Sequence, residues 1–224
     1  MTRFLKDLRH HLFYRAITRP IPGLLSIGQE CPWTILPDGL GPASHVLCAG
    51  AGHDISFELE LSKRLHCSLY LMDPSPTGQK TWEKSRHLRK GITFLPFALS
   101  DRDGDIPLGE PLDPVEGSYR TLSGNDSRQL RVPARGIISL MMEWRWNHID
   151  LLKLDIEGGE FCVLDALLKS KTPVRQICVE LHHGKGFSTR GKDSVRAILQ
   201  LLSHGFRLVH RLHWDHTFVH RSIL

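Results

Sequence analysis

A lysine and three carboxylates interrupt the segment LLKLDIEGGE, residues 151–160, whose apolar residues otherwise predict a buried strand. Burying a charge is costly unless the charge is paired or used by a ligand. Asp155 and Glu157 leave this strand beside two glycines, so we interpret them as site residues. Lys153 is expected to be partly buried or to reach an edge of the sheet. Glu160 falls in the first turn of the next predicted helix, where an acid suits the helix dipole, and is interpreted as structural.

Polar residues also end the other predicted strands, although the bodies of these strands are apolar. In open parallel sheets, ligands bind beside the carboxyl ends of the strands, so we expect these residues to share one cleft. They are Gly50, Ala51, Gly52, His53 and Asp54 after the first strand, Asp73 after the second, Ser100 and Asp101 after the third, and Glu180, His182 and His183 after the fifth.

The glycine turn and Asp73 predict a cofactor that contains adenosine. Glycines let the backbone approach a ligand closely, and an acid at the end of the second strand suits a ribose diol. The dinucleotide pattern G-x-G-x-x-G fails because Ile55 occupies the third glycine position. Asp54, at the start of the next helix, would also repel a pyrophosphate. S-adenosylmethionine has a ribose, an amino group and a sulfonium but no phosphate, so it fits this pattern better.

Strand and helix patterns alternate after residue 44, which predicts an α/β fold with a mostly parallel sheet and helices on both faces. The last two strands are joined by the short segment HWD and predict an antiparallel hairpin at one edge. Residues 105–133 show little periodicity and are interpreted as a loop-rich insertion. Strands are predicted at residues 45–50, 67–74, 92–100, 149–156, 174–183, 206–212 and 216–222, and helices at residues 54–65, 75–90, 138–146, 158–170 and 193–205.

The N-terminal residues 1–19 predict an amphipathic helix. We expect it to cap the main domain, and peripheral contact of its basic side with a membrane is the alternative. The prolines that follow mark an irregular connector, so we divide the chain into residues 1–43, with helix and connector, and a catalytic domain over residues 44–224. The apolar stripe of the helix consists of Leu5, Leu8, Leu12 and Ala16.

The composition of the chain indicates how many domains, which compartment and which partners to expect. The chain has 224 residues, of which 41% are hydrophobic and 24% charged, as expected for one main domain with a real core. Five cysteines without a CxxC pair predict free thiols in a reducing compartment, and no secretory signal is recognisable, so we expect a cytoplasmic protein. The net charge is +5, but the basic residues are not interleaved with aromatics, so no nucleic-acid partner is expected.

The chain resembles the FkbM family of S-adenosylmethionine-dependent methyltransferases in the order and spacing of five segments: VLCAGAGHDISFELEL, LYLMDPSP, FLPFALSDRDG, LLKLDIEGGEFCVLDAL and ICVELHHG. The most specific piece is KLDIEGGE, which is similar to the family signature K-[IL]-D-[VI]-E-G-x-E. The resemblance implies a Rossmann-like seven-stranded sheet with a C-terminal antiparallel hairpin. It also implies methyl transfer, most often to hydroxyl oxygens of sugars, glycans or other small molecules.

The resemblance also implies roles for residues at the strand ends. The family's usual acid on the first strand is replaced by Cys48, and Asp54 stands in place of the last glycine of the turn. Asp54 is therefore expected to supply the carboxylate that meets the methionine ammonium. The implied cofactor-binding residues are Gly50, Ala51 and Gly52 at the methionine part, Asp73 at the ribose, Ser100 and Asp101 beside the adenine, and Asp155 with Glu157 near the sulfonium and the acceptor.

Methyl transfer to oxygen needs alignment of the acceptor and removal of its proton. Candidates for the base are His182, whose ordinary pKa suits the task, and Asp155. Glu180 is a candidate for orienting His182. A divalent metal held by Asp155, Glu157 and either Glu180 or His182 would instead lower the pKa of the hydroxyl.

Two other functions fit parts of the sequence. The segment GFSTRGKD, Gly186 to Asp193, is one residue away from the phosphate-binding pattern G-x-x-x-x-G-K-[ST], but Asp193 replaces the hydroxyl that binds magnesium. The second alternative is a non-catalytic module that binds S-adenosylmethionine or a nucleotide, because Cys48 and Asp54 depart from the family pattern. Turnover with any acceptor would exclude it.

Overall fold

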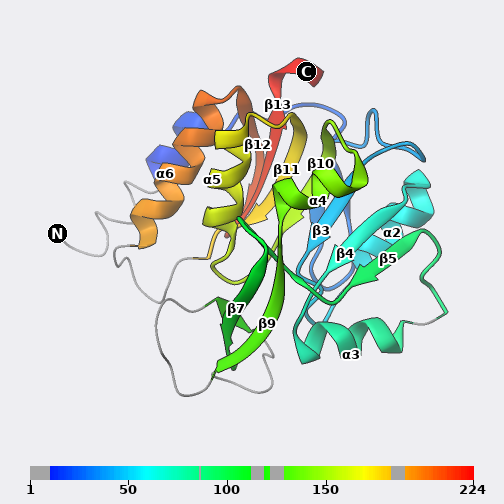
Figure 1. The fold of residues 1–224 in the computed structure, drawn as a ribbon. Coiled ribbons are helices and arrows are strands. Elements are labelled where there is room, and N and C mark those ends of the chain that lie inside the picture. Colours follow the sequence, from blue (N-terminus) through cyan, green and yellow to red (C-terminus); the bar gives the residue numbers. More distant parts are fainter. Residues whose placement is uncertain (1–10, 86, 112–118, 122–128, 183–189) are drawn as a thin grey trace.

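A seven-stranded sheet forms the centre of the protein (Figure 1). The structure is a computed structural model that describes residues 11–85, 87–111, 119–121, 129–182 and 190–224. The strands lie in the order β12 (Phe206–Leu212), β13 (Asp215–His220), β11 (Val174–Glu180), β10 (Ile149–Leu154), β3 (Val46–Ala49), β4 (Leu69–Met72) and β5 (Ile92–Leu95).

Only β13 runs against the other strands of this sheet, pairing antiparallel with both β11 and β12. The remaining neighbours are parallel, from β11 through β10, β3 and β4 to β5. The predicted Rossmann-like sheet with seven strands and a C-terminal antiparallel hairpin is therefore confirmed.

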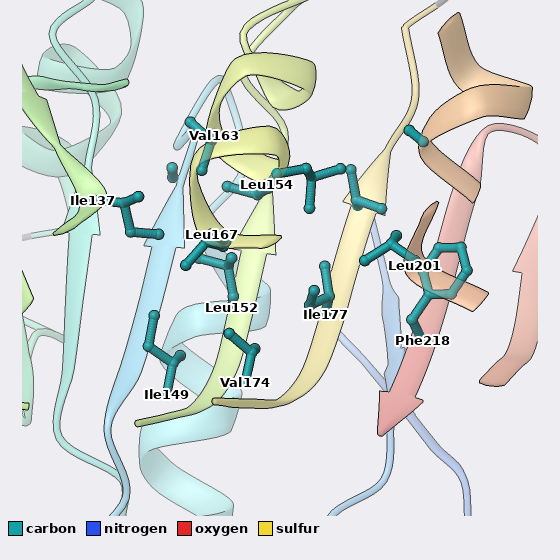
Figure 2. Packing of buried hydrophobic residues seen from close by; sticks show 14 of the residues in the cluster. Ile137, Ile149, Leu152, Leu154, Val163, Leu167, Val174, Ile177, Leu201 and Phe218 are labelled. Carbon is teal, nitrogen blue, oxygen red and sulfur yellow. The ribbon is translucent and has the colours of Figure 1, made fainter. Parts of the chain in front are cut away.

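Helices cover both faces of the sheet, as the alternating pattern predicted. Side chains of β10 and β11 such as Leu152, Leu154 and Ile177 pack against Val163 and Leu167 in one core (Figure 2). A second core on the opposite face contains residues of α2, β1 and β2. The first face is covered by α4 (Ile137–Trp144), α5 (Glu160–Ser170) and α6 (Arg190–Ser203), and the second by α2 (Ser56–Leu65) with β1 (Leu25–Ile27) and β2 (Trp33–Ile35).

A second sheet stands where one long strand and a loop-rich insertion were predicted. The predicted strand at residues 92–100 divides at Pro96: β5 stays in the large sheet, and the next strand enters the small one. The interpretation of residues 105–133 as loops was wrong for the parts that the structure describes. The small sheet contains β6 (Ala98–Ser100), β9 (Gln129–Gly136), β7 (Gly104–Gly109) and β8 (Arg120–Thr121), in that order.

The N-terminal helix caps the main domain, as expected, but through other residues than the predicted stripe. Residues 11–17 are helical, and the buried Tyr14 places its hydroxyl 2.8 Å from Nε2 of His216. Leu12 is 51% exposed and Ala16 is also exposed, so the stripe was wrong for both. Leu5 and Leu8 lie outside the described residues, and the membrane contact of this helix stays a prediction.

The Pro-rich connector is more regular than expected. β1 and β2 pair antiparallel within it, and Ile27, Trp33 and Ile35 are buried against the large sheet.

The helix α3 (Pro76–Lys84) is capped by Ser75, whose hydroxyl accepts a hydrogen bond from the Gly78 amide. All five cysteines are free. Among the described residues, no helix combines the length and apolar character needed to span a membrane.

Candidate active site

The carboxyl ends of β3, β4, β10 and β11 border a cavity of about 390 Å³. Ser100 and Asp101 are absent from the described residues that line it; Ser100 is buried below the surface and Asp101 is exposed. Ala98 and Leu99, from the start of β6, line the cavity in their place. The predicted site residues that do meet in the cavity are Gly50, Ala51, Gly52, His53, Asp54, Asp73, Asp155, Glu157, Glu180 and His182.

Gly50 allows the ends of two neighbouring strands to approach each other. Its φ is +93°, and a Cβ atom at this position would lie 1.8 Å from the carbonyl oxygen of Asp155. The Asp155 amide in turn donates to the carbonyl of Ala49 at 3.0 Å. A residue with a side chain would therefore push the glycine turn away from the strand that carries Asp155.

Asp73 holds the glycine turn from the end of β4. Its Oδ2 accepts hydrogen bonds from the amides of Ala51 at 2.8 Å and Gly52 at 3.1 Å. Its Oδ1 accepts from the Ser75 amide at 2.7 Å, at the start of α3. Gly78 packs on the same carboxylate, because a Cβ there would lie 2.2 Å from Asp73 Cγ. The acid is thus fixed in one orientation at the cavity wall.

Asp54 ties the start of α2 to the preceding connector. Its Oδ1 accepts from the Ser56 amide at 2.8 Å, and its Oδ2 accepts from the Cys31 amide at 3.0 Å and the Ser56 hydroxyl at 2.8 Å. Burial raises the pKa of Asp54, but these hydrogen bonds outweigh burial and lower it below the ordinary value. Asp54 is therefore an ionised carboxylate on the cavity wall, and its role toward the methionine ammonium stays a prediction.

Lys153 can lie in an apolar strand because its charge is paired. Its side chain is only 3% exposed, and Nζ lies 3.3 Å from Oε1 of the fully buried Glu58 on α2. Nζ also donates to the Gly50 carbonyl at 2.6 Å, which supports the glycine turn from below. Burial lowers the pKa of Lys153, but the charges of Glu58 and Asp155 and the hydrogen bond to Glu58 together outweigh burial and raise it.

Glu58 was missed by the sequence reasoning. The backbone pairing sets Cys48 beside Lys153, so the strand position of the family's usual acid carries no charge here. The carboxylate reaches the same neighbourhood from α2, because Glu58 lies on its buried face with Phe57 and Leu61. An acid on the apolar face of a predicted amphipathic helix was the signal that could have found it.

His182 lies among four carboxyl groups, two from the segment after β10, one from α5 and one from β11. Its ring is partly buried, with 19% of the side chain exposed. The arrangement joins the predicted residues Asp155, Glu157, Glu180 and His182 in one cluster. Nδ1 of His182 lies 2.8 Å from Oε1 of Glu160, and Nε2 lies 3.3 Å from Oε2 of Glu157, 3.6 Å from Oε1 of Glu180 and 3.9 Å from Oδ1 of Asp155.

Glu160 begins α5, as its structural interpretation predicted, and its carboxylate also makes hydrogen bonds around the site. Its side chain is completely buried. Besides its contact with His182, it accepts hydrogen bonds from the amides of Ile156 at 3.1 Å and Gly158 at 2.9 Å. One carboxylate therefore shapes the turn after β10 and orients the histidine. Glu157 leaves that turn with a φ of +50°, a conformation that a non-glycine residue rarely adopts.

The cluster changes the protonation of its members. Burial lowers the pKa of His182, but the hydrogen bond and charge of Glu160 and the charges of Glu157 and Glu180 outweigh burial and raise it to about 10. Burial and the charge of Asp155 raise the pKa of Glu180 to about 8. Burial and Asp155 likewise raise the pKa of Asp215 on β13 to about 6. In this arrangement His182 is protonated at neutral pH, and the carboxylates around it repel one another.

Asp155, Glu157 and His182 have the composition and spacing of a metal site. Each offers one ligand atom, and the three atoms lie within 4.8 Å of one another. Carboxylate oxygens suit hard divalent cations such as Mg²⁺ and Mn²⁺. The mutual repulsion of the nearby acids would be relieved by such a cation.

Comparison with known proteins identifies the family. Residues 40–208, more than half of the chain, match the model of the methyltransferase FkbM domain. The chain belongs to the FkbM family of S-adenosylmethionine-dependent methyltransferases. The matched range of this FkbM protein includes every residue of the His182 cluster. The segment Gly186 to Asp193 lies within the matched range too, although residues 183–189 are outside the described part of the structure.

Solved structures with a similar fold share little sequence with the FkbM protein. Monomeric WbdD is 11% identical, with a TM-score of 0.47, over 96% of this chain and 40% of that chain. The Methanococcus jannaschii fibrillarin pre-rRNA processing protein is 11% identical, with a TM-score of 0.44, over 80% of this chain and 67% of that chain. An S-adenosylmethionine-dependent methyltransferase from Aquifex aeolicus is 15% identical, with a TM-score of 0.40, over 80% of this chain and 81% of that chain. No curated protein matches the sequence significantly.

Proposed function

We propose that the protein transfers the methyl group of S-adenosylmethionine to a hydroxyl oxygen of a sugar or another small molecule. The observation that carries this proposal is the cluster of Asp155, Glu157, Glu180 and His182, which shares one cavity with the glycine turn. A cofactor held by the turn and an acceptor held beside the cluster would be close enough for direct transfer.

The charge of the cavity supports a cationic cofactor. Lys153 is already paired with Glu58, and His182 is the other cationic group of the wall at neutral pH. The chain as a whole carries +5, so the acidic cavity is not a consequence of composition. A sulfonium and an ammonium group are stabilised by such a wall. The described residues that line the cavity include six carboxyl groups, of which Glu180 is mostly protonated at neutral pH: Glu30, Asp54, Asp73, Asp155, Glu157 and Glu180.

The wall of the cavity supports one placement of the cofactor. Asp73, fixed at the end of β4, would accept hydrogen bonds from the ribose hydroxyls. Ala98 and Leu99 offer an apolar surface for the adenine ring, in place of Ser100 and Asp101. The methionine part would then lie along Gly50 and Gly52, with its sulfonium toward Asp155.

The reaction requires little from the protein beyond alignment and proton removal, because the sulfonium already activates the methyl group. His182 is protonated in this arrangement, so Asp155 is the better base for the acceptor hydroxyl. Asp155 is only partly exposed, with 29% of its side chain accessible, and its Oδ1 faces His182 Nε2. Asp155 would take up the acceptor proton as the methyl group moves from sulfur to oxygen and S-adenosylhomocysteine leaves, and the positive charge of His182 would stabilise the Asp155 carboxylate before transfer.

A divalent cation would fit the same residues. Asp155, Glu157 and His182 would hold it, and it would lower the pKa of the acceptor hydroxyl. Binding would require His182 to lose the proton at Nε2, while Glu160 keeps its hydrogen bond to Nδ1. This is the arrangement by which second-layer carboxylates orient histidine ligands.

Calorimetric titration with S-adenosylmethionine, NAD and ATP, each alone, tests the cofactor first. We expect binding of S-adenosylmethionine only, and its loss in Asp73→Ala. Turnover is then measured as release of S-adenosylhomocysteine with a panel of sugars, with and without Mg²⁺ or Mn²⁺. Asp155→Asn should bind the cofactor and lose turnover. Binding without turnover on any acceptor would favour the non-catalytic module, and absence of binding would leave the fold without the activity.

A further inference from the structure

A second group of metal-binding side chains lies at the other end of the large sheet. His45 directly precedes β3, and His148 and Asp150 stand at the start of the neighbouring strand β10. Their ligand atoms lie within 4.8 Å of one another. Because β3 and β10 are parallel and the cavity is at their carboxyl ends, the length of β10 separates this group from Asp155.

The positions of His148 and Asp150 suit tetrahedral coordination. Nε2 of His148 lies 3.2 Å from Oδ2 of Asp150. Two ligands of a tetrahedral zinc ion, each about 2.0–2.1 Å from the metal, stand about 3.3 Å apart. Nδ1 of His148 lies 2.6 Å from Oδ1 of Asn147. An oxygen acceptor on the far nitrogen is the usual way in which a ligating imidazole is oriented.

His45 is held in a comparable way. Its Nδ1 lies 3.1 Å from the carbonyl oxygen of His148. A carbonyl can only accept, so this hydrogen bond assigns the ring proton to Nδ1 and leaves the lone pair on Nε2. The ring stacks on Trp146, with centroids 4.6 Å apart and an interplanar angle of 11°. In both histidines Nδ1 therefore meets an oxygen acceptor, and Nε2 is the nitrogen that would bind a metal, which in His148 would replace its contact with Asp150.

Asp150 supplies a carboxylate that is already fixed. It is 3% exposed. Its Oδ1 pairs with Arg175 at 2.9 Å, and its Oδ2 accepts from the His45 amide at 2.8 Å. The His45 amide holds Oδ2 beside His148. The carboxylate thus does not need to reorganise to bind a cation.

We propose that His45, His148 and Asp150 bind a zinc ion, with a water molecule as the fourth ligand. Two imidazoles and one carboxylate suit Zn²⁺, whereas the acidic Asp155 cluster suits harder cations. The site is far from the reacting groups, so its role is structural. It would join residues that are 103 positions apart in the chain and fix the amino ends of β3 and β10.

Cobalt absorption and thermal unfolding test this site in the full-length chain. All measurements use chelator-stripped protein that carries Asp155→Asn and His182→Gln, so that the first cluster does not contribute. We expect one equivalent of Co²⁺ to give the strong visible bands of tetrahedral coordination, and Zn²⁺ to displace it and raise Tm. His148→Gln should weaken binding about 10-fold or more and abolish the rise in Tm.

Matched variants separate loss of the site from loss of the fold. His148 is partly exposed, with 29% of its side chain accessible, so its replacement should leave the metal-free Tm unchanged. His45→Gln is the second test and should weaken binding in the same way. His87→Gln, an exposed histidine outside the group, should bind as before. The proposal is overturned if the background protein binds no Co²⁺, or if the His45 and His148 variants bind it as tightly as the His87 variant.

Discussion

Nδ1 of His182 lies 2.8 Å from Oε1 of Glu160, a carboxylate that is completely buried at the start of α5. The same carboxylate accepts two backbone amides from the turn that carries Glu157. The position of the histidine, the shape of the turn and the charge of the cluster therefore depend on one side chain.

Glu160→Gln should preserve the shape of this side chain and remove its charge. We expect the pKa of His182 to fall, because the Glu160 hydrogen bond and charge are the main causes that raise it. Turnover should drop about 10- to 100-fold while the Kd of S-adenosylmethionine changes little, since the residue acts through others. The pH profile of kcat, with the His182 ring followed by NMR, checks both effects. Asp165→Asn on the same helix, where the acid pairs with Lys169, is the control and should leave the profile unchanged.

The stability of the metal-free protein should fall as pH rises from about 6.5 to about 10. The pKa of His182 is raised from 6.5 to about 10 in the folded state, so its stabilising contribution is full below 6.5 and is lost as pH passes 10. Glu180, raised from 4.5 to about 8, acts with the same sign at lower pH. Urea unfolding at several pH values in the presence of EDTA measures the slope. His182→Gln should flatten it above pH 6.5, and an unchanged slope would show that the histidine is not protonated in the fold.

Lys153→Met should destabilise the fold strongly. It leaves Glu58 completely buried without its cation, and breaking a buried pair in this way costs about 3–5 kcal/mol. The free energy of unfolding in urea gives the size of the loss. The double variant Lys153→Met with Glu58→Gln removes both charges and should recover part of it. If the double variant is as unstable as the single one, the loss comes from packing rather than from the uncompensated acid.

Gly50→Ala should damage the site far more than Gly52→Ala, although both glycines have positive φ values of 93° and 49°. At Gly50 the new methyl group would meet the Asp155 carbonyl at 1.8 Å, whereas nothing lies within 4 Å at Gly52. We expect Gly52→Ala to cost about 1–3 kcal/mol from its conformation alone. Gly50→Ala should in addition displace the turn and abolish binding of S-adenosylmethionine, which calorimetry measures. Equal binding by the two variants would contradict the close approach of the strands.

The large sheet was predictable because its signals are local and repeated. Four of its strands, β3, β4, β10 and β11, are short apolar runs that lead into a glycine or an acid, and these ends share one edge because the strands are parallel. This is why Gly50, Asp73, Asp155 and His182 could be placed in one cleft from the sequence. The family signature KLDIEGGE added the expected activity, which the match over residues 40–208 supports at the level of the family.

The small sheet could not be predicted because the composition of its strands is typical of turns. β7 and β9 each contain proline and glycine, which are depleted in strands and favour turns. Apolar residues do occupy alternate positions, with the partly buried Ile106 and the buried Leu108 in one strand and the buried Val132 and Ala134 in the other. Such a short alternation is too weak to outweigh the turn-forming residues. The strand pairing depends on contacts between distant segments, which no local pattern contains.

The contacts of two residues at the site were not predicted, for a different reason. Glu58 and Glu160 lie on helices, where an acid usually marks a solvated face or a helix start. Their burial arises only when α2 and α5 pack on the sheet beside Lys153 and His182. Ser100 lies outside the cavity wall because Pro96 turns the chain out of the large sheet before that position is reached, and its role beside the adenine stays a prediction.

The division of the chain at Pro96 means that two sheets build one cavity. The large sheet contributes the charged floor, whereas Leu99, Ile106, Leu108 and Tyr119 contribute a wall from the segment of the small sheet. A change in the wall leaves the backbone that holds the glycine turn untouched. The shape of the cavity can therefore change through Ile106, Leu108 and Tyr119, while the strands that carry Gly50, Asp73 and Asp155 stay as they are.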